Sequence, residues 1–153
     1  MRYSFLMALI LFVLSSCNKD KYTTAPQIKF VSVKPNTLSG NLPITGQPLP
    51  IITFHITDAE GDIGFNDGLD TAYIYVKNLL ANTNDSFKFP LLAGATGKNF
   101  QCDVEVIPYT LFQTSTRPTP KTDTLLYEIY VKDFAKNKSN VIKTTEPVFF
   151  VFH

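Results

Sequence analysis

Apolar and polar residues alternate along several short segments of this chain. The clearest segment is 51–57, in which Ile52, Phe54 and Ile56 are separated by polar residues. Successive side chains of a strand point to opposite faces, so this spacing predicts a strand with one buried face. The polar positions, His55 among them, are then expected on the solvent face.

The same alternation recurs in six other segments, and no segment repeats an apolar residue at helical spacing over three turns. Ten prolines and seven glycines punctuate these runs. Short strands with regular turn signals are typical of an all-β sandwich. The expected strands are 27–33, 51–57, 71–79, 87–92, 99–107, 124–132 and 141–152. We therefore predict a seven-stranded antiparallel β-sandwich.

Two residues refine this picture. Pro90 interrupts the fourth expected strand, which predicts an edge position because proline cannot donate to a neighbouring strand. Cys102 shares a face with Phe100 and Val104, so we expect it to pack in the core as an inert thiol with a raised pKa.

A motif in the sixth expected strand carries a family resemblance. The run Tyr127-x-Ile129-x-Val131-x-Asp133, with the residues up to Ser139, resembles the sixth strand and following turn of bacterial immunoglobulin-like and fibronectin-type modules. Those modules often read Tyr-x-Val-x-Val-x-Asp-x-Ala-Gly-Asn-x-Ser. The resemblance implies an immunoglobulin-like sandwich and makes Tyr127 a candidate tyrosine corner.

The first sixteen residues have the parts of an export signal: basic Arg2, an apolar core at 5–14, and small residues before a cut. The core is far shorter than the roughly 20 residues that span a bilayer as a helix. Leu14-Ser15-Ser16-Cys17 resembles the lipobox of bacterial lipoproteins, whose cysteine is acylated, for example with palmitate. An ordinary secretory signal is the alternative.

The lipoprotein resemblance implies a division of the chain and a compartment. Residues 1–16 are expected to be the signal peptide, 17–26 a polar tether lipidated at Cys17, and 27–153 the folded domain. Lys19-Asp20 resembles the export signal of Bacteroides-group lipoproteins. We therefore expect a cell-envelope protein anchored by lipid to the outer membrane, either surface-exposed or periplasmic.

The charge and cysteine content of the chain exclude some binding partners and covalent links. Loss of Arg2 from 14 basic residues leaves 13, against 13 acidic residues, so the mature chain is formally neutral. A neutral chain without a basic run has no electrostatic footprint for nucleic acid. With Cys17 acylated, Cys102 has no partner, so no intramolecular disulfide is expected.

The most acidic stretch runs from Asp58 to Asp70 and contains three glycines. Carboxylates near a glycine turn can converge on one point, and Ca2+ takes six to eight oxygens. In a seven-stranded sandwich the loops after strands two and six lie at the same end. The alternative is a solvated loop in which Asp58 caps a turn. The candidate ligands are Asp58, Glu60, Asp62, Asp67, Asp70, Asp133 and Asn137.

Catalytic motifs are missing from the sequence. The two histidines, His55 and His153, belong to no metal pattern or nucleophile arrangement. Aromatic residues could instead stack on sugars or on another protein, or simply cover the sheet. The candidate binding aromatics are Phe65, Tyr73, Tyr75 and Tyr109.

These observations favour a non-catalytic binding or accessory module that meets an envelope protein or glycan. One alternative is a structural or adhesive domain stabilised by Ca2+. The other is a glycan-active enzyme subunit that uses a carboxylate pair such as Asp62 and Asp67.

Overall fold

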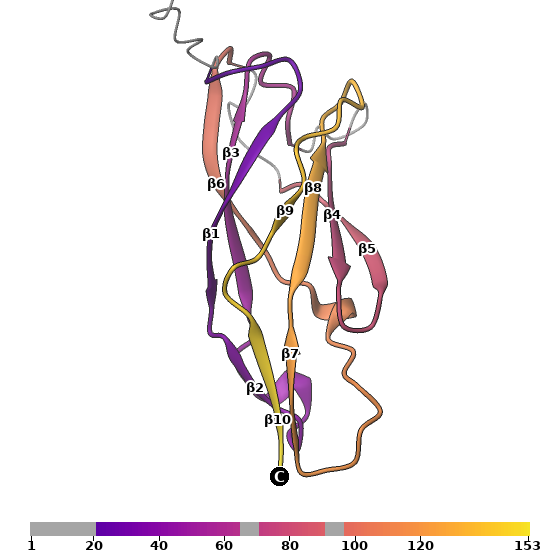
Figure 1. Ribbon diagram of the computed structural model, residues 1–153. Helices are drawn as coiled ribbons and strands as arrows, with labels where there is room; N and C mark the ends of the chain where they lie inside the picture. Colours follow the sequence, from indigo (N-terminus) through magenta and orange to yellow (C-terminus); the bar gives the residue numbers. More distant parts are fainter. Residues whose placement is uncertain (1–20, 65–70, 91–96) are drawn as a thin grey trace, which may run out of the picture.

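The computed structural model describes residues 21–64, 71–90 and 97–153, and strands dominate these ranges (Figure 1). The strands are β1 (Gln27–Lys34), β2 (Thr37–Ser39), β3 (Ile51–Asp58), β4 (Tyr73–Asn78), β5 (Thr83–Lys88), β6 (Phe100–Val106), β7 (Lys121–Leu125), β8 (Tyr127–Lys132), β9 (Ile142–Lys143) and β10 (Val148–Phe152). Two single-turn 3-10 helices, η1 (Ile44–Gly46) and η2 (Tyr109–Leu111), accompany them. Within these ranges no helix has the length and apolar character needed to cross a membrane.

The strands form three small sheets. Their orders are β1-β3-β6, β5-β4-β8-β9 and β2-β10-β7. Every pairing is antiparallel except that of β2 with β10. In Figure 1 the β1-β3-β6 sheet stands on one side and β4, β5 and β8 on the other. The predicted all-β fold with antiparallel sheets is therefore confirmed, and the arrangement is consistent with a β-sandwich.

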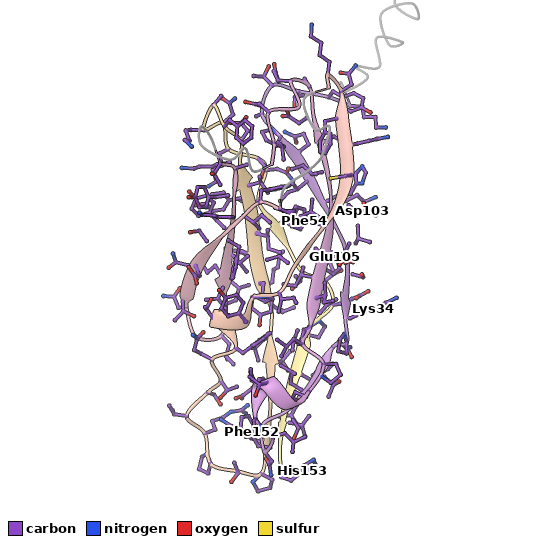
Figure 2. All side chains as sticks on the ribbon, turned by 180° about the vertical axis from the view of Figure 1, so that it is seen from behind. Lys34, Phe54, Asp103, Glu105, Phe152 and His153 are labelled. Atoms are coloured by element: carbon purple, nitrogen blue, oxygen red, sulfur yellow. The ribbon has the colours of Figure 1, made fainter. Side chains whose placement is uncertain are left out.

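The space between the layers is filled by the side chains that the alternation placed inward. Ile52, Phe54 and Ile56 of β3 are fully buried, and Ile129 and Val131 of β8 oppose them from the other layer. Figure 2 shows Phe54 turned inward, with Asp103 and Glu105 on the outer side of β6. The period-two pattern thus identified the core face of these strands correctly.

Cys102 lies on the inward face of β6, but it is only half-buried. It packs against the edge of the core, and burial raises the pKa of its thiol. The predicted packing role is consistent with this position.

Two of the long expected strands are each divided. The expected strand 124–132 is β7 followed by β8, and the expected strand 141–152 is β9 followed by β10. β7 pairs with β10, whereas β8 pairs with β4 and β9, so the chain leaves one sheet for another at Leu126. The Leu126 carbonyl accepts a 2.9 Å hydrogen bond from Leu79 N at this crossing. Because alternation continues across the break, the sequence pattern carries no sign of it.

The expected strand at 87–92 is wrong in position. Residues 83–88 form β5, and the turn precedes it, with Asn82 at a φ of 56°. Asn78 holds that turn, because its side-chain oxygen accepts from Leu80 N at 2.8 Å and Ala81 N at 3.1 Å. The polar residues 83–86 precede the expected strand but belong to β5, an edge strand in which polar side chains can remain in contact with solvent. β5 does end its sheet, but Pro90, from which the edge position was predicted, lies beyond its last residue.

A short strand, β2, lies in the segment expected to be a loop. Thr37–Ser39 pairs in parallel with β10, and Leu38 is buried. A three-residue strand is too short to show alternation, so it could not be predicted from the sequence.

Tyr127 ties the long loop after β6 to the core. Its ring is fully buried, and its hydroxyl donates a long 3.4 Å hydrogen bond to the backbone oxygen of Leu111 in η2. Burial raises the pKa of the phenol. Leu111 and Phe112 of this loop are themselves buried. The predicted role of Tyr127, a hydroxyl fastening a backbone loop, agrees with this contact.

The start of the described chain and its end lie at opposite ends of the domain (Figure 1). Near the start, Thr23 O accepts a 3.1 Å hydrogen bond from Ala59 N. The segment that leads into β1 is therefore fastened to the loop after β3, where the acidic stretch begins.

Candidate metal centre

Three carboxylates meet at the end of the domain where the chain enters it. Asp58 is the last residue of β3, Asp62 lies in the loop that follows, and Asp133 comes directly after β8. One carboxylate oxygen from each lies within 4.8 Å of the other two. Calcium binds oxygens at 2.3–2.6 Å, so two ligands of one ion lie at most about 5 Å apart. The spacing fits a single Ca2+.

A tight turn positions the first of these carboxylates. Asp58 Oδ2 accepts a 2.6 Å hydrogen bond from Gly61 N, which closes the turn onto the strand end. Gly61 has a φ of 70°, a conformation that costs little only without a Cβ. The glycine in the acidic stretch therefore returns the chain so that Asp62 comes back towards Asp58.

The loop after β8 packs against this turn. Phe134 N donates to Asp62 O at 3.0 Å, and Ala135 N donates to Asp62 Oδ2 at 3.3 Å. These bonds join two loops more than seventy residues apart in the sequence. They place Asp133 beside the acidic loop, as the topology argument predicted.

Asn137 holds Asp133 in place. Its backbone N–H donates to Asp133 Oδ1 at 2.7 Å, and its side-chain amide donates to Asp133 Oδ2 at 2.9 Å. The intervening Lys136 has a φ of 69°, at the position where the motif that this run resembles carries glycine. Asn137, predicted as a ligand, here orients a carboxylate through its N–H groups.

Among the described residues, no basic side chain forms an ion pair with the buried carboxylates of this cluster. Asp58 and Asp133 are fully buried, and Asp58 Oδ1 and Asp62 Oδ1 accept no hydrogen bond from the described residues. Ion pairs between described residues form elsewhere, at Asp103 and Asp123. The chain described in the structure thus leaves two shielded oxygens unsatisfied, at a cost that a bound cation would remove.

The pKa values reflect this environment. Burial raises the pKa of Asp58 to about 6, and the negative charges of Asp62, Glu60 and Asp133 add to this rise. The hydrogen bond from Gly61 N acts in the opposite direction and lowers the pKa. Burial also raises the pKa of Asp133, although both N–H groups of Asn137 oppose this. The folded site therefore penalises its own charged state, as a site that receives a cation does before the cation arrives.

Of the remaining candidate ligands, one is placed by the structure and two lie outside the described residues. Glu60 is exposed and stands outside the three-carboxylate cluster, although its charge acts on both buried aspartates. Asp67 and Asp70 lie outside the described residues, as do Phe65 and Cys17.

The candidate binding aromatics separate into two places. Tyr73 and Tyr75 lie half-buried on the outer face of β4, with ring centroids 6.4 Å apart. Tyr109 is on η2, where it packs edge-on against Phe87 at 5.8 Å. The prediction that Tyr109 shares a surface with the β4 tyrosines is not supported by these contacts.

Sequence reasoning missed the closest partner of Tyr75. Tyr130 of β8 stands directly opposite it in the sheet, and the two rings stack with centroids 4.6 Å apart and planes 5° apart. Alternation in 124–132 places Tyr130 on the outward face, so the sequence indicated that this ring is on the sheet surface. Its partner depended on the register between β4 and β8, which the sequence does not specify.

His55 is remote from this surface. It lies on the outer face of β3, and its Nδ1 is 2.7 Å from Asp103 Oδ1 on β6. This exposed pair accounts for the histidine as a surface residue, as the alternation predicted.

No protein-family model, curated protein or solved structure gives a significant match to this chain.

Proposed function

We propose that this chain is a lipid-anchored, non-catalytic module of the cell envelope whose domain binds one Ca2+ at its anchored end. The observation that carries the proposal is the cluster of Asp58, Asp62 and Asp133, with two shielded oxygens that lack a partner. Hard oxygen donors with three formal negative charges suit Ca2+, and water completes a coordination shell of six to eight.

A cation resolves the energetic conflict at this site. Isolated buried carboxylates are costly, and a protein normally pairs them or keeps them protonated. Asp58 and Asp133 meet only acids and N–H donors among the described residues. A divalent ion neutralises the repulsion and also joins the loop after β3 to the loop after β8.

The strand order supports an immunoglobulin-like identity for the domain. In the constant-type sandwich the first, second, fourth and fifth strands form one sheet, and the third, sixth and seventh form the other. Here the matching strands β1, β3 and β6 share one sheet and β4, β8 and β9 share the other, whereas β5 departs from this order by pairing with β4. The buried Tyr127 hydroxyl on the η2 backbone supports the same assignment.

The lipid anchor gives the site an orientation. If Cys17 is acylated, the five tether residues before Thr23 (18–22) hold the domain on the order of 12 Å from the membrane. The hydrogen bond from Ala59 N to Thr23 O fastens the end of that tether to the acidic loop. The cation site then faces the membrane, and the opposite end of the domain extends outward.

The geometry gives a glycan-active enzyme less support. Glycosidase carboxylates flank a substrate, with separations of about 5–9.5 Å that leave room for the sugar bond. The predicted pair includes Asp67, which lies outside the described residues, whereas the described carboxylates converge with one oxygen each within 4.8 Å, and Asp58 and Asp133 are fully buried. This arrangement suits an ion better than a polysaccharide.

Calorimetric titration of the full chain in detergent micelles tests the cation site. We expect about one Ca2+ per chain and loss of binding in the double variant Asp58→Asn, Asp62→Asn. Glu60→Gln is the matched control, because this exposed acid lies outside the cluster and should preserve the stoichiometry. Absence of Ca2+ binding by the unmodified chain contradicts the cation site.

Metabolic labelling tests the anchor separately. We expect labelled palmitate to join the full chain and to be absent from Cys17→Ser. A chain that carries no label and washes from membranes in plain buffer contradicts the lipoprotein assignment, whatever the domain binds.

A further inference from the structure

A hollow of about 480 Å3 lies on the outer face of the β5-β4-β8 sheet, away from the carboxylate cluster. Its lining includes Tyr75 and Lys77 from β4, Asn84 from β5, Glu128 and Tyr130 from β8, and Lys138. Small-molecule sites commonly measure 300–1,000 Å3, so the hollow has the size of a ligand site.

The stacked tyrosines form one rigid wall of this hollow. Tyr75 and Tyr130 are paired across the sheet, which fixes both backbones, and their rings are nearly parallel. The Lys138 ammonium lies 4.1 Å from the centroid of Tyr130. Since Tyr75 covers one face of that ring, the ammonium must lie over the other face.

Hydrogen-bond donors and hydrogen-bond acceptors both surround the stacked tyrosines. Lys77 stands between Asn84 and Glu128 in the register of the three strands. Ammonium and amide N–H groups donate hydrogen bonds there, and carboxylate and amide oxygens accept them. Lys77 and Lys138 are balanced by Asp85 and Glu128 within the lining. A polyanion or an anionic membrane would meet these carboxylates, so neither suits the hollow.

We propose that this hollow binds a neutral oligosaccharide. Each sugar hydroxyl both donates and accepts, which requires alternating donors and acceptors of the kind found here. The C–H face of a sugar ring needs a flat, polarisable surface, which a fixed tyrosine supplies. Lys138 is exposed, and an exposed cation–π contact is weak, so its ammonium can leave Tyr130 and donate to a sugar oxygen instead.

This inference names a ligand class for the proposed binding module. None of Asp58, Asp62 and Asp133 lines the hollow, so the site does not depend on the cation. The two proposals can therefore fail separately.

The experiment is a titration of the full chain in detergent micelles with neutral hexasaccharides, in Ca2+ and in chelator. The panel contains cello-, xylo-, manno- and malto-hexaose, with a heparin hexasaccharide and phosphatidylglycerol vesicles as anionic arms. The chain has no tryptophan, so tyrosine fluorescence can follow binding alongside calorimetry, and the Tyr75 and Tyr130 variants show how much of the signal comes from the wall. We expect at least one neutral sugar to bind in both conditions.

Variants place that binding in the hollow. Tyr130→Ala and Tyr75→Ala should weaken it about tenfold or more, since stacking and positioning are both lost. Tyr109→Ala is the matched control, because this tyrosine is exposed on η2 and should keep full affinity. Glu128→Gln preserves the wall and removes only a charge, so it tests the polar contacts if an alanine variant fails to fold.

Three results overturn the proposal. One is no binding of any neutral sugar at millimolar concentration. Another is binding confined to the heparin fragment or the vesicles. The last is unchanged affinity in both Glu128→Gln and a folded Tyr130→Ala. Sugar binding that persists in a chain with no Ca2+ binding supports the hollow and contradicts only the cation site.

Discussion

Asp58 and Asp123, two of the three fully buried aspartates among the described residues, have opposite surroundings. Asp123 in β7 receives Arg117 Nη2 at 2.6 Å and Lys121 Nζ at 3.2 Å, together with the N–H and hydroxyl of Ser115. Among the described residues, Asp58 in β3 accepts a side-chain hydrogen bond only from Gly61 N, and its neighbours Asp62 and Asp133 are acids. One carboxylate is satisfied by the chain itself, and the other is left with a shielded oxygen.

This difference in surroundings indicates the role of each carboxylate. Burial works against the charge of Asp123, but Arg117, Ser115 and Lys121 outweigh it and hold the pKa well below its ordinary range. Burial raises the pKa of Asp58 to about 6, and neighbouring acids add to the shift. Asp123 therefore acts as a structural anchor for the loop before β7, whereas Asp58 must obtain a proton or a cation from solution.

The largest effect is expected on removing the charge of Asp123. Asp123→Asn leaves Arg117 and the nearly buried Lys121 without their counter-ion. Breaking a buried pair typically costs about 3–5 kcal/mol, and we expect a loss of that size in urea unfolding. Asp103→Asn, which breaks only an exposed pair with His55, should change stability by less than about 1 kcal/mol. Equal losses in the two variants would contradict the anchoring role of Asp123.

The next effect is an unusual pH dependence in chelator. The folded pKa of Asp58 exceeds its ordinary value of 3.8, so the folded chain binds more protons than the unfolded chain between about pH 4 and 6. Stability should therefore fall as pH rises through 6, by on the order of 3 kcal/mol. Asp123 has the opposite sign, because its lowered pKa gives stability that is lost only as pH falls below 4. Urea unfolding from pH 4 to 7.5 measures the slope, and a chelated protein whose stability rises across that range would contradict it.

A smaller and sign-changing effect is expected from Asp58→Asn. Its amide oxygen can still accept from Gly61 N, and the buried charge is gone. At pH 7 in chelator we expect this variant to be about 1–2 kcal/mol more stable than the unmodified chain, since a buried unpaired charge is removed. In saturating Ca2+ the order should reverse. Glu60→Gln should stay within about 0.5 kcal/mol in both conditions, as surface changes usually do.

The smallest effect concerns the turn that presents Asp133. Lys136 has a φ of 69°, which is strained for a residue with a Cβ. Lys136→Gly should relieve that strain and stabilise the domain by about 0.5–1 kcal/mol, with Lys138→Gly on a neighbouring exposed position as the destabilising control. A loss of stability in Lys136→Gly would show that the Lys136 side chain makes a contribution larger than the strain.

The sequence predicted the carboxylate cluster only in part. Alternation identified β3 and β8, and the position of their loops at one end brought Asp133 to the acidic stretch. The burial that separates Asp58 from exposed Glu60 depends on the Gly61 turn and on packing against Phe134, which are properties of the folded chain. Spacing alone therefore could not tell a buried carboxylate from a solvated one.

The contacts of Asp123 and Tyr130 could not be predicted from the sequence either. The partners of Asp123 come from the segment 113–121, which the sequence described only as a long loop rich in threonine and proline. Tyr130 stood on the predicted outward face, but its stacking on Tyr75 required the register of β8 against β4. Both features depend on which strands are neighbours, and alternation specifies faces without specifying neighbours.

The most direct test of the cation site is the thermal unfolding of the full chain in Ca2+ and in chelator at pH 7. A ligand that binds only the folded state stabilises it by about 2.7 kcal/mol at a hundred times its dissociation constant. For a domain of this size that corresponds to a rise in Tm of roughly 5–10 °C. We expect that rise in the unmodified chain and in Glu60→Gln, and its disappearance in Asp58→Asn, Asp62→Asn. Identical melting in Ca2+ and in chelator would contradict the account.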